Sequence, residues 1–203
     1  EAFAALREDG SVVTWGASDR GGDSSLVADA IDAQNGTPAV TQVFSTDFGA
    51  FAALREDGSV ITWGRGNSGS DSSSVADELD GNGTRAVTQI FSTNSAFAAL
   101  REDGSVVTWG GAGGDSSSVA EEIDADDTPA ITQVFSTTRA FAALREDGSV
   151  VTWGYESSGG DSSIRTLNPR TGRYEGSSIA DELSSGVETI ASPFTLNDET
   201  ATE

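Results

Sequence analysis

The stretch AFAALREDGSVVTWG occupies residues 2–16 and recurs, with a single Val-to-Ile exchange, at residues 50–64, 96–110 and 140–154. Successive copies begin 44–48 residues apart, so four repeats account for most of the 203 residues. The coils of a β-solenoid are shorter, at about 20–29 residues. A repeat of this length therefore predicts one small sheet per repeat.

Each copy predicts a β-hairpin followed by a third strand. AFAALR and SVVTWG are joined by Glu-Asp-Gly, a three-residue turn in which the Gly supplies a positive φ. Runs rich in Val, Thr and Phe predict a further strand, because β-branched and aromatic residues favour strands. These runs lie at residues 39–46, 86–93 and 130–137, and a degenerate version lies at residues 187–194.

The hairpin strands are apolar on both faces. Phe3 and Ala5 point to one side of the first strand, and Ala4 and Leu6 point to the other. A sheet that is apolar on both faces needs a neighbouring sheet on each side. Sheets stacked radially around an axis supply such neighbours.

The order of strands at the two ends predicts how the array closes. The chain opens with a hairpin that lacks a preceding third strand, and residues 187–194 are a third strand with no following hairpin. We expect residues 187–194 to pair with the strand at residues 2–7, within one chain or between consecutive subunits. The prediction is an all-β, four-bladed β-propeller, closed or donor-completed by its C-terminal strand. It forms a single domain over residues 1–203, with a tail at residues 195–203. The alternatives are part of a larger propeller, or a filament.

The pattern Ala-Leu-x-x-Asp-Gly-x-Val-x-x-Trp-Gly, at residues 5–16, 53–64, 99–110 and 143–154, resembles the repeat of the regulator of chromosome condensation propeller family. The resemblance implies propeller blades and no catalytic residue. The family usually carries more repeats, and its Gly-Gln-Leu-Gly segment is replaced here by Gly-Gly-Asp-Ser at residues 21–24. The exchange-factor and chromatin roles of the family's founding member have no matching residues in this sequence. Similar repeats occur in long secreted and surface proteins of aquatic microbes.

The composition excludes several function classes. There are 33 acidic and 11 basic residues, a net charge of −22, and no Lys, His, Cys or Met. Cys and His nucleophiles and zinc sites of the usual type are therefore absent. The negative charge opposes binding to nucleic-acid phosphates, and no apolar run approaches the ~18 residues of a membrane helix. An acidic, lysine-free composition indicates a saline habitat, because salt screens self-repulsion.

The fourth repeat contains an insertion at residues 164–177 that predicts a hairpin. It carries Arg165, Arg170 and Arg173 against a single acid, together with Tyr174. Arg and Tyr are enriched where interfaces concentrate their binding energy. We expect this hairpin to contact a neighbouring subunit or domain. The alternative is a tolerated surface insertion without a partner.

Two other repeated features have a structural and a functional interpretation. Asp23, Asp71, Asp115 and Asp161 each precede Ser-Ser and are expected to cap a short helix, whereas a ring of Ca²⁺ ligands is the weaker alternative. Trp15, Trp63, Trp109 and Trp153 are expected to pack in the core rather than to stack on sugars. Arg-Glu-Asp-Gly is explained by turn formation with a local ion pair.

No enzyme site is predicted. Serine has no His or Lys to activate it, and the acids of the repeats occur in equivalent copies, whereas a catalytic pair needs two different environments. The predicted function is a structural or adhesive module of a secreted or cell-surface protein, or of an extracellular filament. It needs no cofactor and binds further copies or neighbouring domains. A propeller that binds glycans or Ca²⁺ is the alternative.

Overall fold

The computed structural model describes residues 1–34, 36–81, 85–111, 113–161, 166–167, 174–175 and 183–191, the side chains of the two short segments 166–167 and 174–175 excepted. Its strands form one antiparallel sheet per repeat. The first sheet contains β1 (Ala2–Leu6) and β2 (Val12–Gly16). The following sheets have three strands each. They are β3 (Val40–Ser45), β4 (Ala50–Arg55) and β5 (Val60–Gly64); β6 (Val87–Ser92), β7 (Ala96–Arg101) and β8 (Val106–Gly110); and β9 (Ile131–Ser136), β10 (Ala140–Arg145) and β11 (Val150–Gly154).

The hairpin turns follow from their Asp and Gly residues. Gly10 has φ 80°, and its N–H donates to the Arg7 carbonyl. Asp9 Oδ1 accepts hydrogen bonds from the backbone N–H and the hydroxyl of Ser11, at 3.0 and 2.6 Å. The same bonds form at Asp57, Asp103 and Asp147. The turn therefore fixes the same hairpin register in every repeat, with Phe opposite Trp.

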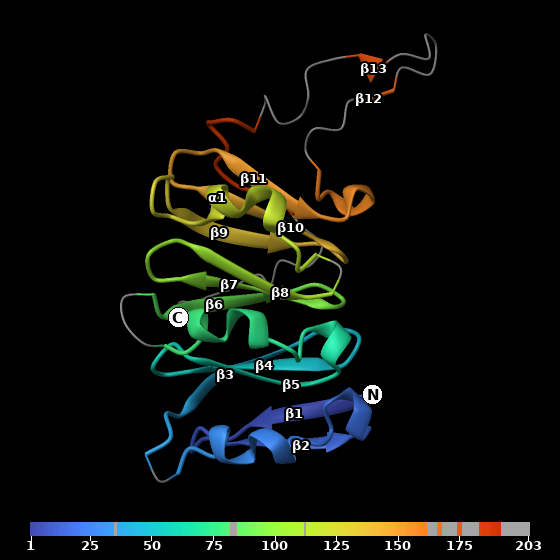
Figure 1. Cartoon of the computed structure of the whole chain (residues 1–203), viewed down its shortest axis with the longest axis vertical. Coiled ribbons are helices and arrows are strands. Elements are labelled where there is room, and N and C mark those ends of the chain that lie inside the picture. The colour runs from blue at the N-terminus through green and yellow to red at the C-terminus, as the bar shows by residue number, and fades with distance from the viewer. Residues whose placement is uncertain are drawn as a thin grey trace, which may run out of the picture.

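The helices predicted after Asp-Ser-Ser are mostly 3-10 helices. They are η2 (Ser25–Ala30), η4 (Ser73–Glu78) and η5 (Ser117–Val119), which runs into α1 (Ala120–Ile123). Further single turns follow β2, β5 and β11, as η1 (Ser18–Arg20), η3 (Gly66–Ser68) and η6 (Glu156–Ser158). Figure 1 shows these elements along the sides of the sheets, which leaves the faces of the sheets free to contact one another.

The sheets are stacked face to face in an open series, with β1–β2 at one end and β9–β11 at the other (Figure 1). The expected closed four-bladed ring is therefore not what the structure has, and among the described strands β1 pairs only with β2. Closing a ring with four blades requires a quarter-turn between neighbours. Figure 1 shows the successive sheets stacked face to face, and small Ala side chains lie on one side of each joint.

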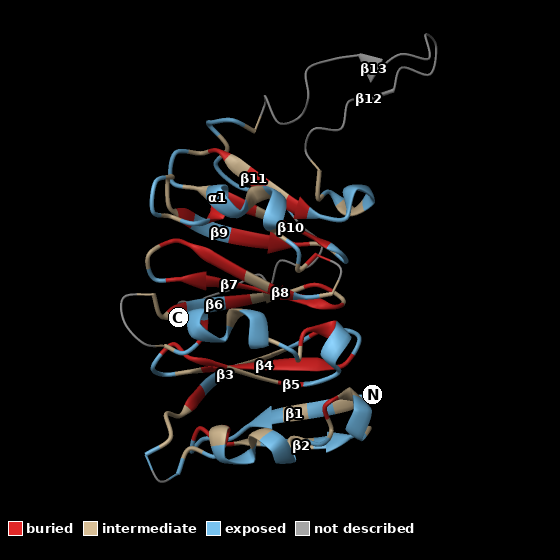
Figure 2. Ribbon diagram, viewed as in Figure 1, coloured by how far each residue is buried: buried red, intermediate tan, exposed pale blue. Residues whose placement is uncertain are grey.

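The core consists of one apolar layer at each joint between sheets. At the second joint, Ala50, Ala52 and Leu54 pack against Phe97 and Trp109. The third joint repeats this with Ala96, Ala98 and Leu100 against Phe141 and Trp153. The predicted burial of both faces is confirmed for the inner sheets, whereas most of β1 and β2 is exposed (Figure 2).

Residues 183–191 lie along the last sheet. Val150 N–H donates to Leu183 O at 2.8 Å, and Val187 N–H donates to Gly148 O at 2.9 Å. Val40, Val87 and Ile131, the first residues of β3, β6 and β9, make the same bond to the Gly of the preceding hairpin. Val187 thus occupies the position at which the third strand of a further sheet begins. Among the described residues, no helix combines the length and apolar composition needed to cross a membrane.

Candidate functional site

The first sheet presents an uncovered apolar face at one end of the stack. Phe3, Val13 and Trp15 are 60%, 48% and 50% exposed. Large apolar side chains gathered on one surface mark sites of interaction. We call this surface the head face, defined by Phe3, Ala5, Val13 and Trp15.

The same four positions are covered in the inner sheets. Phe51 and Trp63 are 6% and 5% exposed, and they pack with Ala53 against the first sheet. Trp63 Nε1 donates to Gly21 O of the preceding repeat at 3.1 Å, and Trp109 Nε1 donates to Gly69 O at 2.9 Å. The equivalent Phe, Ala and Trp side chains are therefore buried wherever a preceding sheet is present, and Ile61, at the position of Val13, is half-buried.

The aromatic pair of the head face already has the geometry of the buried pairs. The ring centroids of Phe3 and Trp15 are 5.4 Å apart, and those of Phe51 and Trp63 are 5.3 Å apart, in stacked arrangements. A surface that needs no rearrangement loses less conformational entropy on binding. The head face is thus preformed for a partner.

The opposite end of the stack has a matching hollow. It is lined by Ala140, Ala142, Gly159, Ile190 and Ala191, among others. A Cβ added to Gly159 would meet no atom of the described residues within 4 Å, whereas one at Gly21 or Gly69 would lie 2.5 or 2.7 Å from the ring of the next Phe. Among the described residues, no phenylalanine therefore fills this tail hollow in the way that Phe51 and Phe97 fill its counterparts inside the stack.

Arginines of the hairpin turns connect successive repeats. Arg55 Nη2 donates to Ala30 O at 2.5 Å, and Arg145 Nη2 donates to Glu122 O at 2.6 Å, at the ends of the preceding helices. The expected explanation of Arg-Glu-Asp-Gly by a local ion pair is thus incomplete. Arg7, in the first sheet, is 60% exposed and lies 4.0 Å from Asp9.

The aspartates at the ends of the loops that follow Trp15, Trp63 and Trp109 accept hydrogen bonds from residues two positions further along the chain. Asp71 Oδ1 accepts hydrogen bonds from the N–H and hydroxyl of Ser73 at 3.1 and 2.7 Å, and Asp23 and Asp115 accept from the N–H of Ser25 and Ser117. The Ser73 hydroxyl and then its N–H hold the pKa of Asp71 below its ordinary value of 3.8. Each bond goes to the first residue of the following helix, in a local turn of the Asx type. The N-cap positions are Ser24, Ser72 and Ser116, and none of them makes a side-chain capping hydrogen bond, so the expected capping by the aspartates is not confirmed.

Asp161, the fourth aspartate, is half-buried. Over the described parts of the chain, no three or more acidic side chains gather as a cation site. The aspartates are distributed along the stack and not around an axis, because the sheets do not close into a ring.

The predicted interface hairpin is described only in part. β12 (Thr166–Leu167) and β13 (Tyr174–Glu175) pair antiparallel, with Leu167 opposite Tyr174. Arg165, Arg170, Arg173 and the side chain of Tyr174 lie outside what is described. Their contact with a partner stays a prediction.

Core packing of tryptophan is confirmed for Trp63, Trp109 and Trp153 and wrong for Trp15. The four copies differ only in Ile61, which replaces Val, so the sequence of the copies gives no signal that distinguishes Trp15.

No protein-family model matches the chain, and no curated protein matches it. Among solved structures, it is similar to yeast RCC1 (Prp20), determined with Kap60 bound, at a TM-score of 0.49 and 16% identity over 78% of this chain and 42% of that one. The ectodomain of the receptor kinase CR4 from Physcomitrella patens gives a TM-score of 0.49 and 16% identity, over 77% and 39%. Human WBSCR16 gives 0.46 and 18%, over 78% and 46%. The chain spans less than half the length of each.

Proposed function

We propose that the 203 residues form a non-catalytic structural module that binds protein through its head face. The observation that carries this proposal is the exposed Phe3–Trp15 pair, whose stacked geometry equals that of the pairs buried at every internal joint. Rigid aromatic side chains supply large contact area at low entropic cost, which is why they dominate binding surfaces.

The sheets act as blades of a propeller-type stack that four repeats do not close. Among the described strands, β1 has one unpaired edge, which supports an unclosed stack, because an unpaired strand at a sheet edge is a template for a further strand. The module serves as a rigid spacer or adhesive element rather than as a container for a small ligand, and it requires no metal or cofactor.

A secreted or cell-surface location in a saline environment fits the composition. A net charge of −22 without any lysine favours solubility. At 1 M salt the Debye length is only ~3 Å, so repulsion between the acidic side chains destabilises the fold little. Apolar contacts strengthen under such conditions, which suits a module that binds through aromatic side chains.

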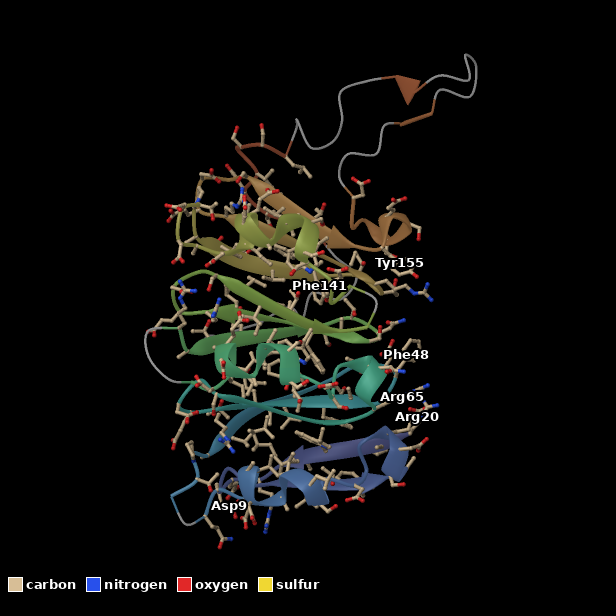
Figure 3. All side chains as sticks on the ribbon, viewed as in Figure 1. Asp9, Arg20, Phe48, Arg65, Phe141 and Tyr155 are labelled. Atoms are coloured by element: carbon tan, nitrogen blue, oxygen red, sulfur yellow. The ribbon has the colours of Figure 1, made fainter. Side chains whose placement is uncertain are left out.

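Photo-crosslinking tests this function. A photoreactive phenylalanine analogue replaces Phe3 in the protein produced in its own host, and the control replaces Phe48, an exposed residue on the side of the stack (Figure 3). We expect a crosslinked protein adduct from position 3 and none from position 48. Adducts to lipid or glycan alone, or equal yields from both positions, would contradict protein binding by the head face.

A further inference from the structure

We propose that the partner of the head face is the tail hollow of a second copy of this chain, so that copies join head to tail and complete one sheet between them. This inference rests on the proposed function, because it names the partner of the same surface. The partner is inferred from the internal joints. At each of them, the face of one sheet that carries the Phe–Trp pair packs against the Ala-rich face of the preceding sheet.

The first matching contact is aromatic. Inside the stack, Phe97 lies against Gly69 with Ala50 and Ala52 beside it. In the tail hollow, Gly159, Ala140 and Ala142 occupy these positions. The ring of Phe3 from a second copy therefore fills the hollow as Phe97 fills its own site. Because Gly159 has φ 94° and no side chain, the ring can approach its backbone closely.

The second contact is a hydrogen bond. Trp63 and Trp109 each donate from Nε1 to the carbonyl of the equivalent Gly in the preceding loop. By the same register, Trp15 Nε1 donates to Gly159 O of the other copy. The turn η6 before Gly159 is equivalent to η1 and η3, which precede Gly21 and Gly69. Both partners of this bond are thus held in the required local structure.

The third contact is strand pairing. Val187 is bonded to Gly148 as Val40 is bonded to Gly10, which aligns the residues that follow with β3. In the β3–β4 pair, Val40 lies opposite Arg55 and Val43 opposite Ala53. The equivalent intermolecular pairs place Val187 opposite Arg7 and Ile190 opposite Ala5. Glu56 N–H also donates to Ala39 O, which predicts a bond from Glu8 N–H to Gly186 O.

The joint is heterologous, because a different surface of each copy takes part. A joined pair keeps one free head face and one free tail hollow, so growth continues as a filament or ends in a ring if the rotation closes. The negative charge of both copies opposes the contact at low salt. Assembly therefore strengthens with salt concentration.

Complementation of two defective variants tests the joint by sedimentation velocity in 1 M NaCl. Trp15→Ala removes the head contact, and a chain ending at Val187 removes the tail strand but keeps the Val187–Gly148 bond. We expect the unaltered chain to associate with increasing concentration and each variant alone to be monomeric. An equimolar mixture should form a one-to-one dimer and nothing larger, because only one joint remains possible. Phe48→Ala, which removes an exposed aromatic side chain from the side of the stack, should associate as the unaltered chain does.

Circular dichroism and cooperative melting establish that each variant is folded. Where the shortened chain fails to fold, Ile190→Asp replaces it, since a charge beside Ala5 blocks pairing. We expect Trp15→Ala to weaken association roughly 30-fold or more, as for a residue at the centre of an interface. A monomeric unaltered chain at millimolar concentration, unchanged association of Trp15→Ala, or a mixture that stays monomeric would overturn the proposal. A crosslink from Phe3 to a different protein would reject the second copy and leave the proposed function intact.

Discussion

The indole Nε1 of Trp109 donates a hydrogen bond to Gly69 O, 2.9 Å away, across the joint between the second and third sheets. Trp153, which is 1% exposed at the equivalent position of the fourth sheet, has no hydrogen-bond partner for its Nε1 among the described residues. The loop from Trp109 to Asp115 is two residues shorter than the loop from Trp63 to Asp71. The joint of Trp153 therefore differs from that of Trp109 in the length of the preceding loop.

The two tryptophans therefore predict different costs for the same substitution. Trp109→Phe leaves Gly69 O without its donor, whereas Trp153→Phe removes an N–H that is already unpaired among the described residues. Both lose similar apolar volume, so the difference isolates the hydrogen bond. We expect Trp109→Phe to lower the free energy of unfolding by about 1–2 kcal/mol more than Trp153→Phe in urea denaturation. Equal losses would show that the hydrogen bond contributes nothing.

Acid should remove the contribution of the hairpin-turn aspartates to the stability of the fold. The Ser149 hydroxyl, then its N–H, with the charge of Arg145, hold the pKa of Asp147 below 3.8. A lowered pKa stabilises the fold above the ordinary value of 3.8, and this stabilisation is lost as pH falls through the folded-state pKa. The melting temperature of Asp147→Ala should lie below that of the unaltered chain at pH 6 and approach it near pH 2.

Asp47→Ala, which also removes one negative charge, corrects this comparison for the effect of net charge. A difference between Asp147→Ala and the unaltered chain that persists undiminished at pH 2 would show that the carboxylate form of Asp147 is not what stabilises the turn.

The net charge of −22 predicts a salt-dependent stability. Screening relieves repulsion among the 33 acidic side chains, so the melting temperature should rise between low and molar NaCl. The Trp15→Ala variant is the better protein for this measurement, because association would add its own salt dependence. A melting temperature that is flat or falls with NaCl would contradict adaptation to a saline environment.

The insertion at residues 164–177 gives a separate prediction. Its basic side chains should meet complementary charge on an acidic neighbouring copy. Deleting residues 164–177 should leave the melting temperature nearly unchanged and weaken self-association in sedimentation experiments. The matched control replaces Arg165, Arg170 and Arg173 by Gln in the intact insertion and should weaken association in the same direction. Unchanged association in both variants would assign the insertion no role in assembly.

Local features of the fold were predictable because they depend on short sequence patterns. The Gly at the hairpin turns and the Val- and Thr-rich third strands determine structure within a few residues, and the observed strands lie where these patterns place them. The predicted helices form mostly as 3-10 helices. Val75 in η4 has a non-helical φ of −126°, which interrupts the regular hydrogen bonding of an α-helix.

The environment of each repeat was not predictable from its own sequence. Phe3 and Phe51 stand in identical copies, yet one is 60% exposed and the other 6%, because burial depends on whether a sheet precedes. The contact of Ala50 and Ala52 with Phe97 likewise joins two different repeats, so neither repeat alone predicts it. In the predicted closed ring, the head face and the tail hollow would both be buried, so neither surface was predicted.

Disulfide trapping tests the head-to-tail joint most directly, because the chain has no native cysteine. Opposed residues of antiparallel strands have Cα atoms about 4.5–5.5 Å apart, within reach of a disulfide. Ala5→Cys and Ile190→Cys are made in separate chains, mixed in 1 M NaCl and oxidised mildly. The account predicts a crosslinked heterodimer with the bond between positions 5 and 190, in higher yield than from Ala5→Cys mixed with Phe48→Cys. Equal yields from the two mixtures, or no crosslink at all, would contradict the head-to-tail joint.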